Sequence, residues 1–119
     1  MIKLYGIKNC DTVKKSMNWL SDNNIKYQFH DYKKDGIDEE KLAEFIEKFG
    51  FEKLLNRKGT TWRQMTRDEQ NKIIDNKSAL ELMRKKPSII KRPIADLGSN
   101  QLIGFDIDEY QKSFCPNRN

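Results

Sequence analysis

Hydrophobic and polar positions follow a strand, helix, strand order over the first thirty residues. Alternation of apolar and polar residues predicts short strands over 2–4 and 25–29. Between them, apolar residues recur from Asp11 to Leu20 at i, i+4 and i+7, the spacing of an amphipathic helix. A crossover of this kind normally joins two parallel strands with a right-handed connection. The apolar residues in these patterns are Ile2 and Leu4, then Val13, Met17 and Leu20, then Ile25, Tyr27 and Phe29.

Helical spacing dominates the middle of the chain, from about residue 36 to 87. One helix is predicted over 38–49, where the apolar residues keep a 3.6-residue period. A second helix is predicted to open at Thr66 and run through Ile74. A third is predicted to open at Ser78, with Glu81 completing a capping box, and to close before Pro87.

The last third of the chain predicts extended structure and then a final helix. Residues 88–91 look extended, and a strand is expected over 101–105 after a hairpin turn at 98–100. The final helix is predicted over 106–113. Its inward-facing residues are predicted to be Ile107, Tyr110 and Phe114.

Without the middle helices, the element order is β-α-β-β-β-α. This order is close to the minimum shared by glutaredoxins and thioredoxins. We therefore expect one α/β domain over residues 1–119, with a mixed four-stranded sheet and a helical insertion at about 36–87. In that arrangement the first strand delivers the chain to the amino end of the first helix, where a reactive cysteine belongs.

Composition narrows the class of protein. The 119 residues contain no apolar run approaching the ~20 residues that span a bilayer, which excludes a membrane-spanning protein. The amino terminus lacks the layout of a secretory signal, so we expect a cytoplasmic protein whose two cysteines, Cys10 and Cys115, are reduced. The single histidine, His30, has no metal-ligand spacing around it, so we expect a core or edge histidine and no metal site.

Charge is unevenly distributed, although the net charge is only +5. Residues 35–52 hold seven acids and two lysines, whereas 53–67 and 84–92 each hold five bases and no acid. These runs fit either solvated faces or an electropositive pocket for a small anion. Binding to nucleic acid is the weakest interpretation, because the aromatic residues lie mostly at core-periodic positions and form no stacking platform.

Cys10 lies at the predicted junction between the first strand and the first helix. Backbone N–H groups at a helix start are unpaired and the helix dipole is positive there, so a thiolate is stabilised. Lys8, Lys14 and Lys15 add positive charge, while Asp11 opposes it. Cysteines placed in this way are commonly nucleophiles. The alternative is a small buried residue or an incidental helix cap.

A Cys-x-x-Cys pair is absent, because the position three after Cys10 is Val13. A redox cycle would therefore use one protein thiol with an external thiol such as glutathione, or a more distant cysteine. Cys115 follows a helix that is expected to run away from Cys10, so we do not expect it to act as a resolving cysteine.

Arg57 and Arg92 are the candidate anion ligands, because a guanidinium can donate two parallel hydrogen bonds to an oxyanion or carboxylate. Further bases near Arg57 fit either an anion site or a solvated surface; they are Lys58, Arg63 and Arg67. Pro93 follows Arg92 and interrupts the extended segment, which usually marks an edge or a bulge.

Three separated segments together resemble the ArsC family, and more narrowly its YffB-like and Spx-like branch. They are YGIKNCDTVKK at residues 5–15, LLNRKGTTWR at 54–63 and IIKRPI at 89–94. The resemblance implies a thioredoxin-like fold with a helical insertion, Cys10 as the nucleophile and a cis bond before Pro93. It also implies anion binding by Arg57 and Arg92. To this set we add Lys8, Asn9 and Thr12, which flank the cysteine.

In glutaredoxin-coupled arsenate reductases of this family, the cysteine attacks arsenate, glutathione forms a mixed adduct and glutaredoxin resolves it. This sequence departs from their pattern twice. Gly6 stands where they carry a histidine four residues before the cysteine, and Phe105 falls near their third arginine. Both departures fit YffB-like members, which are proposed to be glutathione-dependent thiol reductases.

The resulting prediction is a cytoplasmic thiol oxidoreductase that has no bound cofactor and uses glutathione as co-substrate, with glutaredoxin as a candidate partner. One alternative is a glutaredoxin-coupled arsenate reductase. The other is a non-catalytic, Spx-like regulator that binds the RNA polymerase α subunit. Val13 rules out the Cys-x-x-Cys switch that Spx-like regulators often carry, although polymerase binding does not require it.

Overall fold

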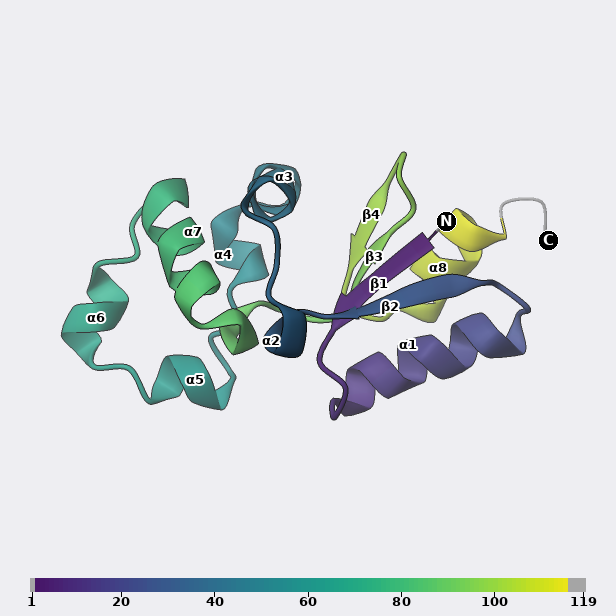
Figure 1. The fold of residues 1–119 in the computed structure, drawn as a ribbon, viewed down its shortest axis with the longest axis horizontal. Coiled ribbons are helices and arrows are strands. Elements are labelled where there is room, and N and C mark those ends of the chain that lie inside the picture. Colours follow the sequence, from purple (N-terminus) through teal and green to yellow (C-terminus); the bar gives the residue numbers. More distant parts are fainter. Residues whose placement is uncertain (1, 116–119) are drawn as a thin grey trace. The chain divides into compact units, whose positions relative to one another are not determined.

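The structure, a computed structural model, describes residues 2–115. They form two compact units, which are described separately (Figure 1). The sheet unit contains residues 2–31 and 92–115, and the helical unit contains residues 32–91. The helical unit is therefore wider than the predicted insertion of about 36–87.

The sheet unit contains four strands and two helices. The strands are β1 (Ile2–Gly6), β2 (Tyr27–Asp31), β3 (Ile94–Asp96) and β4 (Gln101–Ile103), and the helices are α1 (Asp11–Asp22) and α8 (Ile107–Phe114). The strand order is β2-β1-β3-β4. β1 pairs with β2 in parallel and with β3 antiparallel, and β3 pairs with β4 antiparallel. The predicted α/β class and mixed four-stranded sheet are confirmed.

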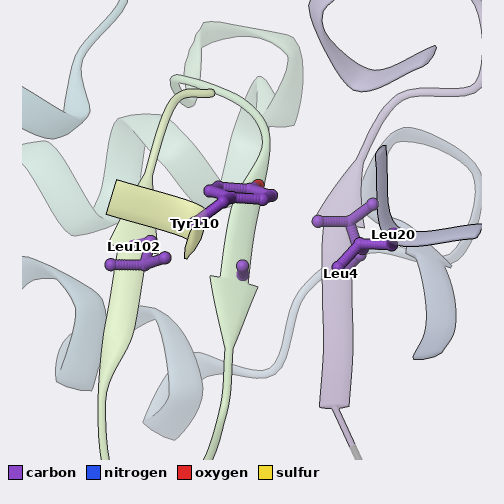
Figure 2. Packing of buried hydrophobic residues seen from close by; sticks show 5 residues of the cluster. Leu4, Leu20, Leu102 and Tyr110 are labelled. Atoms are coloured by element: carbon purple, nitrogen blue, oxygen red, sulfur yellow. The ribbon is translucent and has the colours of Figure 1, made fainter. Parts of the chain in front are cut away.

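The core of the sheet unit lies on the face covered by α1 and α8. Leu4, in the central strand β1, is opposite Phe29 on one side and Ala95 on the other. Leu4 packs with Leu20 of α1, and Tyr110 of α8 belongs to the same cluster (Figure 2). Since burying one leucine side chain contributes about 1.5–3 kcal/mol, this cluster is what holds both helices against the sheet.

A buried hydrogen bond joins the two helices. The hydroxyl groups of Ser16 and Tyr110 lie 2.7 Å apart, and both residues are buried. Burial raises the pKa of Tyr110 to about 12, although its hydrogen bond with Ser16 acts in the opposite direction. The ring of Tyr110 also packs edge-on against Trp19 and Phe105, with ring centroids 5.3 and 4.9 Å away. Tyr110 therefore fixes α8 both to α1 and to the chain that leads into α8.

The helical unit contains six short helices and one 3-10 turn. They are α2 (Tyr32–Asp35), α3 (Glu39–Phe49), α4 (Phe51–Leu54), α5 (Thr60–Arg63), α6 (Arg67–Asn71), α7 (Asn76–Lys85) and η1 (Pro87–Ile89). Its core is built from the apolar faces of α3 and α7 with the residues around them. The Tyr32 hydroxyl donates a buried hydrogen bond of 2.7 Å to the carbonyl of Ile90. This bond ties the first residue of the unit to its last residues.

Two predicted element boundaries in the helical unit are wrong. The helix that opens at Thr66 ends at Asn71 instead of Ile74, and the next helix begins at Asn76, before Ser78. The reason is a capping box in which Asp75 is the N-cap and Ser78 the third residue of α7. The backbone N–H groups of Ile74 and Asp75 donate to the Ser78 hydroxyl, so these residues belong to the start of α7.

The predicted extended segment at 88–91 is also wrong. Pro87 begins a 3-10 turn, η1. Proline suits this first position because the N–H that it lacks would have no partner within the turn. Only Ile90 makes a β-type bridge, to Leu55. In the sheet unit, the last strand is shorter than the predicted 101–105 and ends at Ile103. Gly104 follows with a φ of +79°, which turns the chain out of the strand.

Ile107 was expected to face inward, and this expectation is wrong as well. Tyr110 is fully buried, but Ile107 is 51% exposed. Ile107 is the first residue of α8, so its side chain lies at the end of the helix, where it lines a groove with Thr12 and Lys15 of α1.

The Ser16–Tyr110 hydrogen bond makes a testable prediction about stability. Tyr110→Phe leaves the Ser16 hydroxyl buried without this partner, so we expect a loss of about 1–3 kcal/mol in the free energy of unfolding. Ser16→Ala should cost a similar amount, and the double variant should cost less than the sum of the two. Urea denaturation of the four proteins measures this coupling. Strict additivity would contradict the hydrogen bond.

Candidate functional site

Cys10 is the N-cap residue of α1, at the end of the loop that follows β1. Its backbone is extended, with φ −128° and ψ 124°, and its carbonyl accepts a hydrogen bond of 2.9 Å from the N–H of Lys14. The side chain is half-buried. The predicted place of Cys10, between a strand and the start of a helix, is confirmed.

Gly6, the last residue of β1, lets α1 approach the strand closely. A Cβ atom at Gly6 would lie 2.8 Å from Cγ2 of Val13, which is fully buried in α1. Two non-bonded carbon atoms do not approach so closely, so a residue with a side chain at position 6 would push α1 away from β1. This explains in steric terms why the histidine expected from arsenate reductases does not fit at Gly6.

The environment of Cys10 favours the thiolate. Burial of the thiol raises its pKa, but the backbone N–H of Val13, the guanidinium of Arg92 and the N–H of Thr12 outweigh burial and lower the pKa below its ordinary value. The Cys10 side chain makes no N-cap hydrogen bond that meets the usual geometry. The N–H groups at the helix start still favour a thiolate, because they interact more strongly with a charged sulfur than with a neutral thiol.

Arg92 is the residue that the fold brings to Cys10 from the far end of the sequence. Its side chain is half-buried with a buried Nε atom, and it favours the thiolate both by a hydrogen bond to Cys10 and by its charge. The following Arg92–Pro93 peptide bond is cis, which is the geometry that the family resemblance implies. The sequence predicted Arg92 as an anion ligand; in the structure its guanidinium is one of the groups that lower the pKa of Cys10, and its binding of a substrate anion stays a prediction.

The other predicted anion ligands lie in two places. Lys8 and Asn9 are exposed in the loop before Cys10, and Thr12 is exposed in the first turn of α1. Arg57 belongs to the helical unit, where its guanidinium lies 5.6 Å from the centre of the Trp62 ring, a cation–π contact. A shared anion site of Arg57 and Arg92 stays a prediction.

His30 and Cys115 have other surroundings. His30 is half-buried in β2, and its ring lies 5.2 Å from that of Tyr5 in the neighbouring strand, as expected for a core or edge histidine. Cys115 is the C-cap of α8 and is a free cysteine, like Cys10. Figure 1 shows α8 ending at the opposite end of the sheet unit from the start of α1, as expected for a helix that runs away from the start of α1.

The sequence did not predict an open groove beside the first turns of α1. It has a volume of about 570 Å³ and is lined by Thr12 and Lys15 of α1 and by residues 105–108 at the start of α8. In the sequence, Ile107 could have indicated the groove, because it is an apolar residue between two aspartates. The helical period instead predicted that Ile107 belongs to the core.

Residues 2–115 contain neither a candidate metal site nor a candidate membrane-spanning helix. No group of three or more His, Cys, Asp or Glu side chains is arranged to hold a metal ion there. In the same residues, no helix is long and apolar enough to cross a membrane.

Known proteins resemble this chain over nearly its whole length. An uncharacterized protein of Haemophilus influenzae is 45% identical over 97% of this chain and 100% of its own length. The structure of a protein named YFFB (PA3664) superposes with a TM-score of 0.90 at 43% identity, covering 95% of this chain and 98% of the other. An arsenate reductase (ArsC) related protein from Brucella melitensis is 45% identical with a TM-score of 0.74, covering 96% and 94%.

A more distant relative has a regulatory name. It is the global transcriptional regulator Spx of Listeria innocua, which is 22% identical over 99% of this chain and 89% of its own length. The model of the ArsC family matches residues 5–113, which include Cys10, Arg57, Arg92 and Phe105. The chain therefore belongs to the ArsC family.

Proposed function

We propose that this ArsC-family protein is a thiol oxidoreductase that uses Cys10 to exchange disulfides with glutathione. The observation that supports this most directly is the surroundings of Cys10: a half-buried thiol at the start of α1, with a lowered pKa and the Arg92 guanidinium beside it. Thiolates, not thiols, attack disulfides, so this site favours the reactive form.

The reaction needs one protein thiol. The Cys10 thiolate attacks the glutathionyl sulfur of a mixed disulfide between glutathione and a substrate thiol. The substrate leaves as a thiolate and takes a proton from water, while Cys10 becomes disulfide-bonded to glutathione. A second glutathione, as its thiolate, then attacks that glutathionyl sulfur, which releases the Cys10 thiolate and oxidised glutathione. The electron pair comes from the second glutathione, whose sulfur is oxidised as the substrate sulfur is reduced, so no resident cofactor is required.

Arg92 has two roles in this scheme. It stabilises the Cys10 thiolate before attack and again when Cys10 leaves in the second step. Between these steps, we propose that its guanidinium binds an anionic group of glutathione, with Lys8, Asn9, Thr12 and Arg57 as further proposed ligands. Glutaredoxin is a proposed alternative acceptor for the adduct, and the cytoplasm, rich in glutathione, is the proposed location.

A regulatory function is the alternative, and the Spx relatives are the observation in its favour. A regulator that binds the RNA polymerase α subunit would not need a reactive Cys10. Retention on an immobilised polymerase α carboxy-terminal domain, compared between wild type and Cys10→Ser, separates the two functions. Strong retention by both proteins, with no glutathione exchange, would favour regulation.

The first prediction from this function concerns the adduct. Exposure to oxidised glutathione should add one glutathionyl group to the protein, detected by intact mass spectrometry. Cys10→Ser should abolish the adduct, and the matched control Cys115→Ser should leave it nearly intact. Glutathionylation that is lost in Cys115→Ser and kept in Cys10→Ser would contradict the proposed mechanism.

The second prediction concerns the ionisation of Cys10. Because its pKa is lowered, the rate of alkylation by iodoacetamide should rise with pH at lower pH than for an ordinary thiol. Arg92→Ala should move this profile to higher pH and slow alkylation at neutral pH several-fold, whereas Lys14→Ala, which also removes one charge near Cys10, should move it much less. Arg92→Lys should give an intermediate profile and weaker binding of sulfate or glutathione, since lysine lacks the paired donors. Equal profiles for Arg92→Ala and Lys14→Ala would rule out a specific role for Arg92.

The third prediction is weak or absent arsenate reduction. Gly6 and Phe105 stand where arsenate reductases carry a histidine and an arginine, and losing one such donor typically costs about 10²–10³ in rate. We expect measurable reduction of hydroxyethyl disulfide with glutathione, which needs the thiolate alone, and little turnover of arsenate. Robust arsenate turnover with glutathione and glutaredoxin, lost in Cys10→Ser, would identify arsenate as the substrate.

A further inference from the structure

We infer that the substrate thiol belongs to a polypeptide, and that the groove between the starts of α1 and α8 binds the apolar and basic residues next to its cysteine. This inference rests on the proposed function and specifies its substrate class. The groove lies wholly within the sheet unit, and no residue lining it was among the predicted anion ligands except Thr12.

The groove lies beside the first turns of α1, and Thr12, which lines it, is two residues after Cys10 in the chain. The backbone N–H of the same residue favours the Cys10 thiolate. The opposite wall is the segment from Phe105 to Asp108, which leads into α8. A polypeptide whose mixed disulfide with glutathione is attacked by Cys10 would place the residues next to its cysteine along this groove.

Two apolar side chains line the groove. Ile107 is 51% exposed, and within residues 2–115 the one other large hydrophobic residue that is clearly exposed is Ile74, in the helical unit. Phe105 is half-buried and held by its edge-on contact with the buried ring of Tyr110. A small oxyanion or a hydrophilic thiol gains little from these two side chains, whereas an apolar residue beside a substrate cysteine would cover them.

The charges of the groove favour a basic residue in the same substrate. Asp106 and Asp108 line it, against one base, Lys15. The Asp106 carboxylate accepts the N–H of Glu109 at 3.2 Å as the cap of α8, and Asp108 is exposed. Outside the lining, Asp11 and Lys14 are both exposed near the start of α1 and carry opposite charges, so the excess of acid belongs to the groove itself. A lysine or arginine next to the apolar residue complements this excess of acid.

The chemistry is the exchange already proposed, with the leaving group specified. Cys10 attacks the glutathionyl sulfur of a glutathionylated polypeptide, the Cys10–glutathione disulfide forms, and the polypeptide leaves as a thiolate that takes a proton from water. Contacts in the groove bind the polypeptide, so we expect exchange to be faster with a glutathionylated polypeptide than with the mixed disulfide of a small thiol.

The test compares three glutathione mixed disulfides as substrates: a short peptide with Leu and Lys beside its cysteine, the same peptide with Glu in place of Lys, and 2-mercaptoethanol. Release of each thiol with reduced glutathione is followed for the wild type, Ile107→Ser, Asp108→Lys and the matched control Ile74→Ser. We expect the wild type to prefer the Leu-Lys peptide over 2-mercaptoethanol by roughly tenfold, the discrimination that one apolar group in a pocket typically provides.

Each variant has a distinct expected result. Ile107→Ser should lower the ratio of peptide rate to 2-mercaptoethanol rate several-fold, and Ile74→Ser should not change that ratio. Asp108→Lys should reverse the preference between the Lys and Glu peptides, by about two- to fivefold, as expected for one exposed charge pair. Since both isoleucines and Asp108 are exposed, all variants are expected to fold, which circular dichroism checks.

Failure of the inference and failure of the proposed function look different. If the wild type turns over all three substrates equally, or if Ile107→Ser and Ile74→Ser change the ratio alike, the groove does not bind the substrate but the exchange reaction stands. If the wild type turns over none of them, the proposed function and this inference are both wrong.

Discussion

The close approach of α1 to the end of β1, at Gly6 and Val13, determines the geometry of the candidate site. A single added carbon at Gly6 would meet Val13 at 2.8 Å, so the height of α1 above the strand depends on a residue without a side chain. Cys10 lies in the short loop that joins these two elements, and the N–H of Val13 is one of the groups that favour its thiolate. The same contact that packs the helix thus positions Cys10.

The rest of the sheet unit keeps that arrangement rigid. β1 is a central strand with partners on both sides, and the side chain of Leu4 anchors the cluster that α1 and α8 share. β3, which pairs with β1, directly follows Arg92 and Pro93, so sheet formation also brings the guanidinium to the sulfur. Catalytic geometry built on paired strands is better defined than geometry built on loops alone.

Much of this architecture could be predicted from the sequence, because it depends on local patterns. The alternation around Leu4, the helical period from Val13 to Leu20 and the position of Cys10 between them led to the correct sheet unit. Boundaries were missed where a side chain bonds to the backbone of its neighbours, as Ser78 does with Ile74. Periodicity alone does not contain that information.

The candidate site was predictable in its residue types but not in its contacts. Cys10 and Arg92 are far apart in the chain, and only the pairing of β1 with β3 makes them neighbours. Ile107 matched the apolar period of its helix but lies at the first turn, where a period cannot tell a core position from the rim of a groove. The contact of Arg57 with Trp62 of α5 follows no periodic pattern, so the sequence did not predict it.

The hydrogen bond between Tyr32 and Ile90 has a consequence for how the chain folds. The sheet unit is interrupted by about 60 residues, so pairing β1 with β3 in an unfolded chain would have to close a long loop. A helical unit that has already formed holds its two ends together through this bond, and the loop to be closed becomes a few residues long. The entropy saved is roughly 2 kcal/mol. Helical units with local contacts also form faster than sheets with distant partners. The inserted helices thus favour assembly of the sheet that they interrupt in sequence.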